Sequence, residues 1–179
     1  LEDIHTQNSE PVRQLLRYGS LCCDGTVTFQ GGEEQHIGDP TETAIVLAAH
    51  KNGMPKEELN QRYPRLAELP FDSDRKLMST LHVLEEGETV MLTKGALDVL
   101  LDRSVSLLTS EGVVELTQER REQILAVNQA LSSQGLRVLA FAFRGMPGAR
   151  QVTLEDERDY TFIGLISMID PPRPEAVQA

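Results

Sequence analysis

The stretch from Phe71 to Ala96 reads FDSDRKLMSTLHVLEEGETVMLTKGA. Apolar and polar residues alternate over Leu77–Leu84 and Thr89–Thr93, which predicts two β-strands. The acidic run between them, Glu85–Glu88, contains a glycine and is typical of a hairpin connection. A third strand is predicted just upstream, over Leu66–Phe71. The middle of the chain therefore indicates an antiparallel sheet.

Helices are expected on both sides of this stretch. Asp39 is a favourable N-cap, and Pro40 fits a first helical turn. Glu42 stands three residues past the cap, as in a capping box, so a helix should run to about Asn52. The other helices are predicted over Glu10–Cys22, Lys56–Arg62, Ala96–Leu101 and Thr117–Ser133. The apolar residues of the last helix are expected on one side: Ile124, Leu125, Val127 and Leu131.

The remaining strands complete the fold class. Leu136–Phe143 is apolar on both faces and is expected at the centre of a sheet. The other predicted segments are a hairpin over Val105–Leu108 and Val113–Leu116, a strand over Tyr160–Ile169, and a short hairpin or mobile loop over Asp24–Ile37. Because hairpins and helices gather in clusters rather than alternating strictly, we predict an α+β fold with a mainly antiparallel sheet.

Length and composition indicate one folded domain. The 179 residues suffice for one sizeable core, and 40% of them are hydrophobic. We place the domain at residues 10–169. Residues 1–9 are expected to be a linker remnant, and residues 170–179, which begin Asp-Pro-Pro-Arg-Pro, a second linker. The chain has no initiator Met and is interpreted as a piece of a longer protein.

Several function classes are disfavoured. The formal net charge of −11 argues against a nucleic-acid partner. The apolar stretches are too short to span a bilayer, which needs roughly 20 residues, so we expect no membrane contact. The four histidines lack metal-ligand spacing, and no metal site is assigned. Cys22 and Cys23 are adjacent and are expected as two reduced, buried thiols. Because phosphate-cradle and hydrolase signatures are absent, no catalytic residue is assigned.

The first candidate binding residues lie at the end of the Leu66–Phe71 strand. Phe71 precedes a run of charged residues, which places an aromatic ring beside cations. Lys76 and Met78 should point to the same side of an extended strand. A base stacked on such a ring gains roughly 1–3 kcal/mol. The alternative is an ordinary core phenylalanine.

Four more residues could contribute. Lys94 ends a strand before a helix, where a cation needs an anion or an aromatic face, or else is a solvated turn lysine. Gly95 could keep the floor of a pocket clear or simply serve a turn. Glu42 could accept from a base, although a capping role explains it equally. Arg137 shares a strand face with Leu139 and must be ion-paired, or contact phosphate or ribose at a rim.

Five collinear segments carry a resemblance to a known family. They are GDPTETA from Gly38, FDSDRKLMS from Phe71, TKGA from Thr93, LRVLA from Leu136 and DPPR from Asp170. Together they resemble the nucleotide-binding (N) domain of cation-transporting P-type ATPases, particularly the calcium-pump-like branch. The resemblance spans nearly the whole chain and favours the functional interpretation of Phe71 and Lys94.

The resemblance implies a fold and a site. The fold would be an antiparallel twisted sheet flanked by helix bundles. Adenine would stack on Phe71, with Lys94 and Gly95 lining the pocket and Glu42 reaching the base. The other positions that would border base, ribose and phosphates are Lys76, Met78, Arg137 and Leu139. Asp170 and Arg173 would belong to the hinge.

The resemblance also implies partners. ATP would be delivered to an aspartate in a separate phosphorylation domain, and Mg²⁺ would be needed only there with the nucleotide. That domain and the actuator domain of the same integral membrane pump would be the partners, and the piece itself a cytoplasmic monomer. The DKTGTLT, TGD and GDGxND motifs are missing from the chain, so we expect no turnover by the piece alone.

The sequence leaves two alternatives open. One is an interaction or regulatory domain that keeps the fold without binding nucleotide. The other is a self-sufficient phosphotransferase or hydrolase. Ser73 also stands where animal calcium pumps often carry an arginine, so phosphate contact would fall to Arg137 and Lys76.

Overall fold

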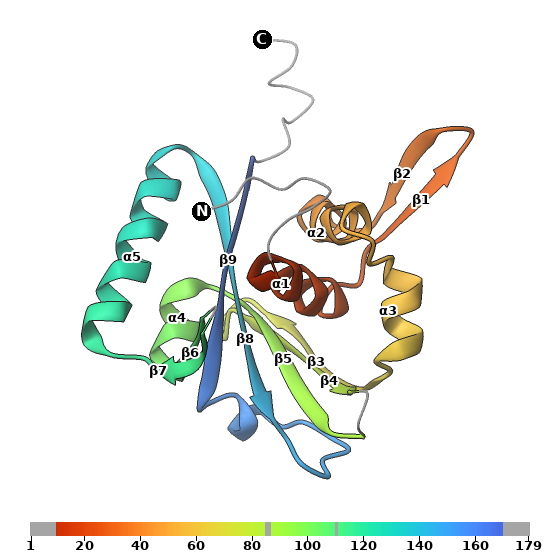
Figure 1. Cartoon of the computed structure of the whole chain (residues 1–179). Coiled ribbons are helices and arrows are strands. Elements are labelled where there is room, and N and C mark those ends of the chain that lie inside the picture. The colour runs from red at the N-terminus through yellow and green to blue at the C-terminus, as the bar shows by residue number, and fades with distance from the viewer. Residues whose placement is uncertain (1–9, 85–86, 110, 170–179) are drawn as a thin grey trace.

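The computed structural model describes residues 10–84, 87–109 and 111–169. A seven-stranded sheet forms its centre, with strand order β3-β4-β5-β8-β9-β6-β7 (Figure 1). The strands are β3 (Arg65–Asp72), β4 (Leu77–Val83), β5 (Thr89–Gly95), β6 (Ser104–Thr109), β7 (Gly112–Glu115), β8 (Leu136–Gly145) and β9 (Tyr160–Ile169). The α+β prediction and the central place of β8 are thereby confirmed.

One strand pair departs from the antiparallel prediction. β6 and β9 run parallel, with Leu107 opposite Phe162, while the other strand neighbours in this sheet run antiparallel. α5 and β8 lie between them in the sequence, and this long connection allows β9 to return in the same direction as β6.

The helices divide between the two faces of the sheet. On one face lie α1 (Glu10–Leu21), α2 (Pro40–Lys51) and α3 (Lys56–Arg62), which share a core cluster with Leu92 and Phe141. On the other face, α4 (Leu97–Asp102) and α5 (Gln118–Ser133) pack around Leu77, Met91 and Tyr160. The sheet is therefore buried between two helical layers.

Local signals explain several helix starts. The side chain of Asp39 accepts a hydrogen bond from the Thr41 amide at 2.8 Å, and Pro40 opens α2. Thr117 caps α5 through the Arg120 amide at 3.3 Å. The predicted apolar side of α5 is wrong in part, because Leu125 is 44% exposed. It follows Ile124 by about 100° around the helix, outside the stripe that faces the sheet.

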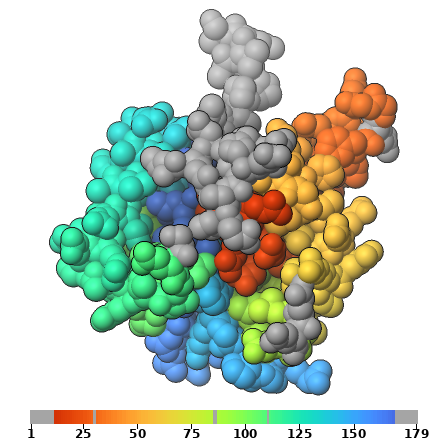
Figure 2. All heavy atoms as spheres, in the orientation of Figure 1, coloured from red at the N-terminus to blue at the C-terminus, as the bar shows by residue number. Residues whose placement is uncertain are grey.

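A separate hairpin projects from the body of the domain. β1 (Thr26–Gln30) and β2 (Glu33–Ile37) pair only with each other among the described strands, which settles the prediction in favour of a hairpin. Figure 2 shows this orange hairpin on one flank and the teal helix α5 on the opposite flank. Phe29 lies 4.8 Å from the His50 ring, between ring centroids, and so rests on α2.

Candidate functional site

The predicted residues converge at one end of the sheet. β5 ends beside the start of β4, so that Leu77 lies opposite Gly95 and Met78 opposite Lys94. β8 continues this row, with Ala140 opposite Gly95, and Leu139 next along the strand packs against the first core cluster. The N-terminus of α2 reaches the same end through the contacts described next.

The central contact is an ion pair between Lys94 and Glu42. Their side chains are only 7% and 18% exposed. Glu42 also accepts from the Asp24 amide at 3.3 Å. The carboxylate predicted to complete a capping box is therefore committed to a lysine 52 residues away. The anion that Lys94 was expected to need is Glu42.

Two adjacent buried cysteines lie near Lys94, and one of them contacts it. The Sγ of Cys23 lies 3.8 Å from the Lys94 ammonium, and both cysteines are buried and free. Burial raises the pKa of the Cys23 thiol to about 12, so it stays protonated at neutral pH. Burial opposes the charge on Lys94, but the neighbouring thiols and Glu42 leave its pKa above the ordinary value. At neutral pH the balancing negative charge comes from Glu42.

Phe71 stands at the rim of this end of the sheet. Its side chain is 61% exposed, so the ring is not part of either core cluster. The alternative of a core phenylalanine is therefore wrong. Pro70 precedes it at the end of β3, and a register shift between Leu69 and Asp72 marks a bulge at this point.

A tight turn follows Phe71. The Asp72 carboxylate accepts from the amides of Asp74 at 2.7 Å and Arg75 at 3.2 Å, and these donors lower its pKa. Lys76 closes the turn with φ +64°, before β4 begins. The prediction that Lys76 and Met78 share a strand side is wrong, since Lys76 is exposed in the turn and Met78 is 4% exposed.

Gly95 has a steric reason to be glycine. A Cβ at this position would lie 2.2 Å from the carbonyl oxygen of Lys76 and 2.8 Å from Leu77 Cδ2. The Ala96 amide donates to the same carbonyl at 3.2 Å. The glycine therefore lets the turn approach the end of β5.

Arg137 joins the site from β8. Its Nη1 donates to the Thr41 hydroxyl at 2.9 Å, next to Glu42 in the first turn of α2. The structure thus brings Glu42, Met78, Lys94, Gly95 and Arg137 together, with Leu139 beside them. Phe71 and Lys76 flank this group on the neighbouring strand end and turn. The hinge residues Asp170 and Arg173 lie outside the described part of the chain.

Sequence reasoning missed a buried polar cluster on the opposite face of the sheet. Arg75 Nε lies 2.6 Å from Glu157 Oε1, and the Glu157 side chain is fully buried. Ser79 donates to the other Glu157 oxygen at 2.5 Å and is 2.7 Å from Thr93 Oγ1. No local pattern could have paired Arg75 with Glu157, because the loop and the turn meet only in the folded chain.

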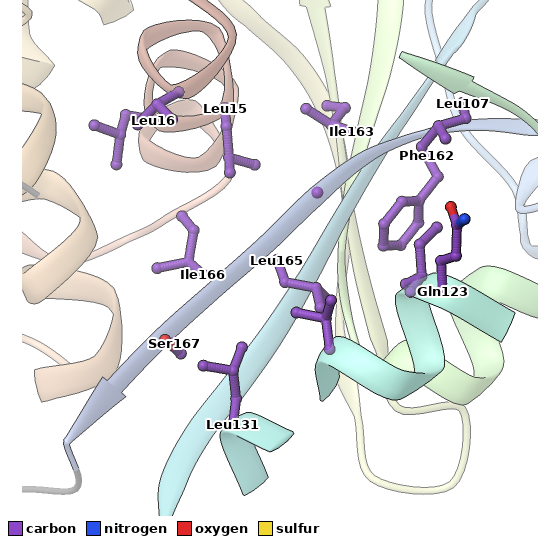
Figure 3. A pocket seen from close by; sticks show the side chains of 14 residues that line it. Leu15, Leu16, Leu107, Gln123, Leu131, Phe162, Ile163, Leu165, Ile166 and Ser167 are labelled. Carbon is purple, nitrogen blue, oxygen red and sulfur yellow. The ribbon is translucent and has the colours of Figure 1, made fainter. Parts of the chain in front are cut away.

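Two hollows lie near these elements. One, of about 290 Å³, is polar and is lined by Cys23, Asp24, Lys56 and Arg65 among others. Its cations are engaged: Lys56 donates to the Gly25 carbonyl at 2.8 Å, and Arg65 contacts Asp24 at 2.7 Å. The second, of about 400 Å³, is an apolar groove over β9 between α1 and α5, where Leu15 and Leu131 face each other across the strand (Figure 3).

Across residues 10–84, 87–109 and 111–169, no group of three or more His, Cys, Asp or Glu side chains could hold a metal ion. Within the same ranges, every helix is too short or too polar to cross a membrane.

Comparison with known proteins places the chain in a family. The model for the P-type ATPase cytoplasmic domain N matches residues 11–175. A calcium-transporting ATPase of Listeria monocytogenes is 41% identical over 172 residues, which is 96% of this chain and 19% of the relative. Calcium-transporting ATPase 1 of Lactococcus lactis is 44% identical over 91% of this chain, and its Saccharomyces cerevisiae namesake 35% over 94%.

The chain spans about a fifth of the length of these relatives, at 18–19% of each. The family match covers nearly all of the described residues, including both strand ends and the helix start that build the site. The resemblance stated from the five motifs is confirmed. This chain belongs to the P-type ATPase cytoplasmic N-domain family.

Proposed function

We propose that this domain is the ATP-binding part of a calcium-transporting P-type ATPase. The relatives that match nearly the whole chain carry the name calcium-transporting ATPase, which supports calcium as the transported ion. The proposal of nucleotide binding rests mainly on the residues gathered at the end of the sheet. There β3 carries an exposed aromatic ring, and β5, on the other side of β4, carries a buried lysine whose charge is balanced by a carboxylate.

The adenine is held mainly by Phe71. The ring is 61% exposed, so a purine can lie on it without displacing core side chains. Such stacking contributes roughly 1–3 kcal/mol. Lys94 lines the pocket beside the base, and the Glu42 carboxylate accepts from the exocyclic amino group.

The ribose and phosphates extend toward the remaining site residues. Lys76 is exposed in the turn beside Phe71. Arg137 lies near Thr41 at the start of α2, and Met78, Gly95 and Leu139 complete the walls. Because Glu42 already neutralises Lys94 and the chain carries a net charge of −11, attraction for a polyphosphate is limited. We therefore expect a dissociation constant on the order of 0.1–1 mM.

The domain binds ATP, and the phosphoryl transfer takes place in another domain. The γ-phosphate is presented to an aspartate in a separate phosphorylation domain, and Mg²⁺ joins with the nucleotide at that interface. The phosphorylation and actuator domains of the same pump are its partners. On this account the piece alone binds ATP and does not turn it over.

Titration of the 179-residue chain with a non-hydrolysable ATP analogue, followed by amide NMR shifts, tests this function. Shifts should centre on Phe71, Lys76 and Lys94. Phe71→Ala should weaken binding by about 5- to 150-fold, in line with the loss of one base stack. Phe29→Ala is the matched control, because Phe29 is a similarly exposed ring, at 47%, on the β1–β2 hairpin.

The outcomes separate the remaining alternatives. Binding that Phe71→Ala leaves intact would contradict the proposed site. The absence of shifts at several millimolar ligand would favour an interaction domain without nucleotide. Measurable ATP turnover by the purified chain with Mg²⁺ would indicate a self-sufficient enzyme.

A further inference from the structure

Arg75 ties the end of β3 to a distant loop. One of its Nη atoms donates to the Pro70 carbonyl at 3.1 Å, directly before Phe71. Its Nε lies 2.6 Å from Oε1 of Glu157, in the loop that leads into β9. The backbone that carries Phe71 is thus connected by one guanidinium to the opposite side of the sheet.

Glu157 is fixed by burial and by contacts of both its side chain and its backbone. Its side chain is fully buried and that of Arg75 is 14% exposed. The second carboxylate oxygen accepts from Ser79 at 2.5 Å, and Ser79 is linked through Thr93 to the Tyr160 hydroxyl, each step at 2.7 Å. Arg103 donates to the Glu157 carbonyl at 3.1 Å. A buried charge is costly unless it is paired. Here Oε2 has a hydrogen bond from Ser79, whereas Oε1 and Arg75 Nε meet only as an ion pair, without the geometry of a hydrogen bond.

The other end of the turn is fixed by close packing. The Lys76 carbonyl accepts from the Ala96 amide at 3.2 Å, and only a glycine at position 95 leaves room for it. The Lys76 amide donates to the Asp72 carbonyl at 2.6 Å. The five-residue turn is therefore held on one side by Arg75 and on the other by Gly95.

We propose that Arg75 and Glu157 are positioning residues for the nucleotide site, an inference that rests on the proposed function. Phe71 is largely exposed, so packing of its own ring does little to fix it. An unfixed ring and turn would have to be ordered when the base binds, and that cost would be subtracted from an already weak affinity. The buried Arg75–Glu157 pair removes this cost by fixing the backbone on either side of the ring.

The test measures affinity for a non-hydrolysable ATP analogue in the 179-residue chain, well below the melting temperature of every variant. Arg75→Met and Glu157→Gln should each weaken binding by about tenfold, because the supporting contacts of a site decide its geometry. The Arg75→Met/Glu157→Gln double variant should bind about as weakly as either single variant, since both remove the same connection.

A matched control separates positioning from general destabilisation. Arg121 is a half-buried arginine that donates to the Leu101 and Ser104 carbonyls, as Arg75 does to Pro70, but it lies on α5. Arg121→Met should lower the melting temperature without changing affinity. Hydrogen exchange at the Lys76 amide gives an independent readout and should speed up in Arg75→Met and Glu157→Gln, and not in Arg121→Met.

Each outcome decides between the two proposals. If the wild-type chain binds and the folded Arg75 and Glu157 variants bind equally well, with unchanged Lys76 exchange, the positioning role is overturned and the proposed function survives. If the wild-type chain does not bind, both are overturned. Should Arg75→Met fail to fold, Glu157→Gln decides alone, because glutamine keeps the size of the side chain and an oxygen for Ser79.

Discussion

Two buried ion pairs in the described part of the domain lie on opposite faces of the sheet and differ in the exposure of their carboxylates. Lys94–Glu42 lies at the sheet end, and the Glu42 side chain is still 18% exposed. In the Arg75–Glu157 pair the arginine is 14% exposed, but Glu157 is fully buried and hydrogen-bonded to Ser79. The carboxylate of the first pair is therefore accessible to a ligand, whereas the carboxylate of the second is not. The same kind of ion pair thus occurs at the proposed binding site, as Lys94–Glu42, and in the contacts that support it, as Arg75–Glu157.

Breaking the Arg75–Glu157 pair should cost the most stability. Arg75→Met leaves the Glu157 carboxylate without its cation in a fully buried position, and we expect the free energy of unfolding to fall by about 3–5 kcal/mol. Lys94→Met leaves Glu42 near solvent and should cost only about 1–2 kcal/mol. Urea unfolding of both variants measures the difference. Equal losses would contradict the distinction between the two pairs.

Acid should weaken the face of the sheet that carries Lys94. His82 is fully buried there between the Tyr63 carbonyl and Thr80, and burial lowers its pKa from 6.5 to about 4. Between these values the unfolded chain binds a proton that the folded chain does not, so stability falls as pH falls from about 6.5 to 4. The loss should reach about 3 kcal/mol.

Replacing this histidine checks the assignment. His82→Gln should flatten the dependence of unfolding free energy on pH across that window. An unaltered slope in His82→Gln would show that other groups cause the acid sensitivity.

A smaller effect should come from the contact between β5 and the turn. Gly95→Ala places a methyl group 2.2 Å from the Lys76 carbonyl oxygen, so the turn must move. We expect a loss of about 1–3 kcal/mol in unfolding free energy and weaker nucleotide binding. Gly145→Ala is a suitable control, because a Cβ added at this position meets nothing within 4 Å. Gly53→Ala is unsuitable, because Gly53 has φ +79°, which strains any residue with a side chain. If Gly95→Ala binds nucleotide with unchanged affinity, the turn plays no part in the site.

Local patterns were sufficient for most of the secondary structure. Asp39 and Thr117 cap the helices predicted from them, and the alternation around the 85–88 hairpin gave β4 and β5, although Glu85 and Glu86 lie outside the described residues. The parallel pairing of β6 with β9 has no local signal, because it depends on which strands meet after the chain has folded.

The candidate site was predictable in its members and less so in its contacts. Five segments far apart in sequence lie in one family pattern, and four of them meet at one sheet end, with Asp170 and the linkers at 1–9 and 170–179 outside the described residues. The partner of Glu42 and the pairing of Arg75 with Glu157 could not be predicted, because both are long-range contacts. That these residues bind nucleotide stays a prediction.

The central claim is that a purine lies on the Phe71 ring beside Lys94. Intermolecular nuclear Overhauser effects between the H2 and H8 protons of a saturating ATP analogue and the ring protons of Phe71 test it most directly. We predict such contacts to Phe71 and none to the exposed ring of Phe29. A saturated sample whose adenine protons contact other residues, and not Phe71, would contradict the account.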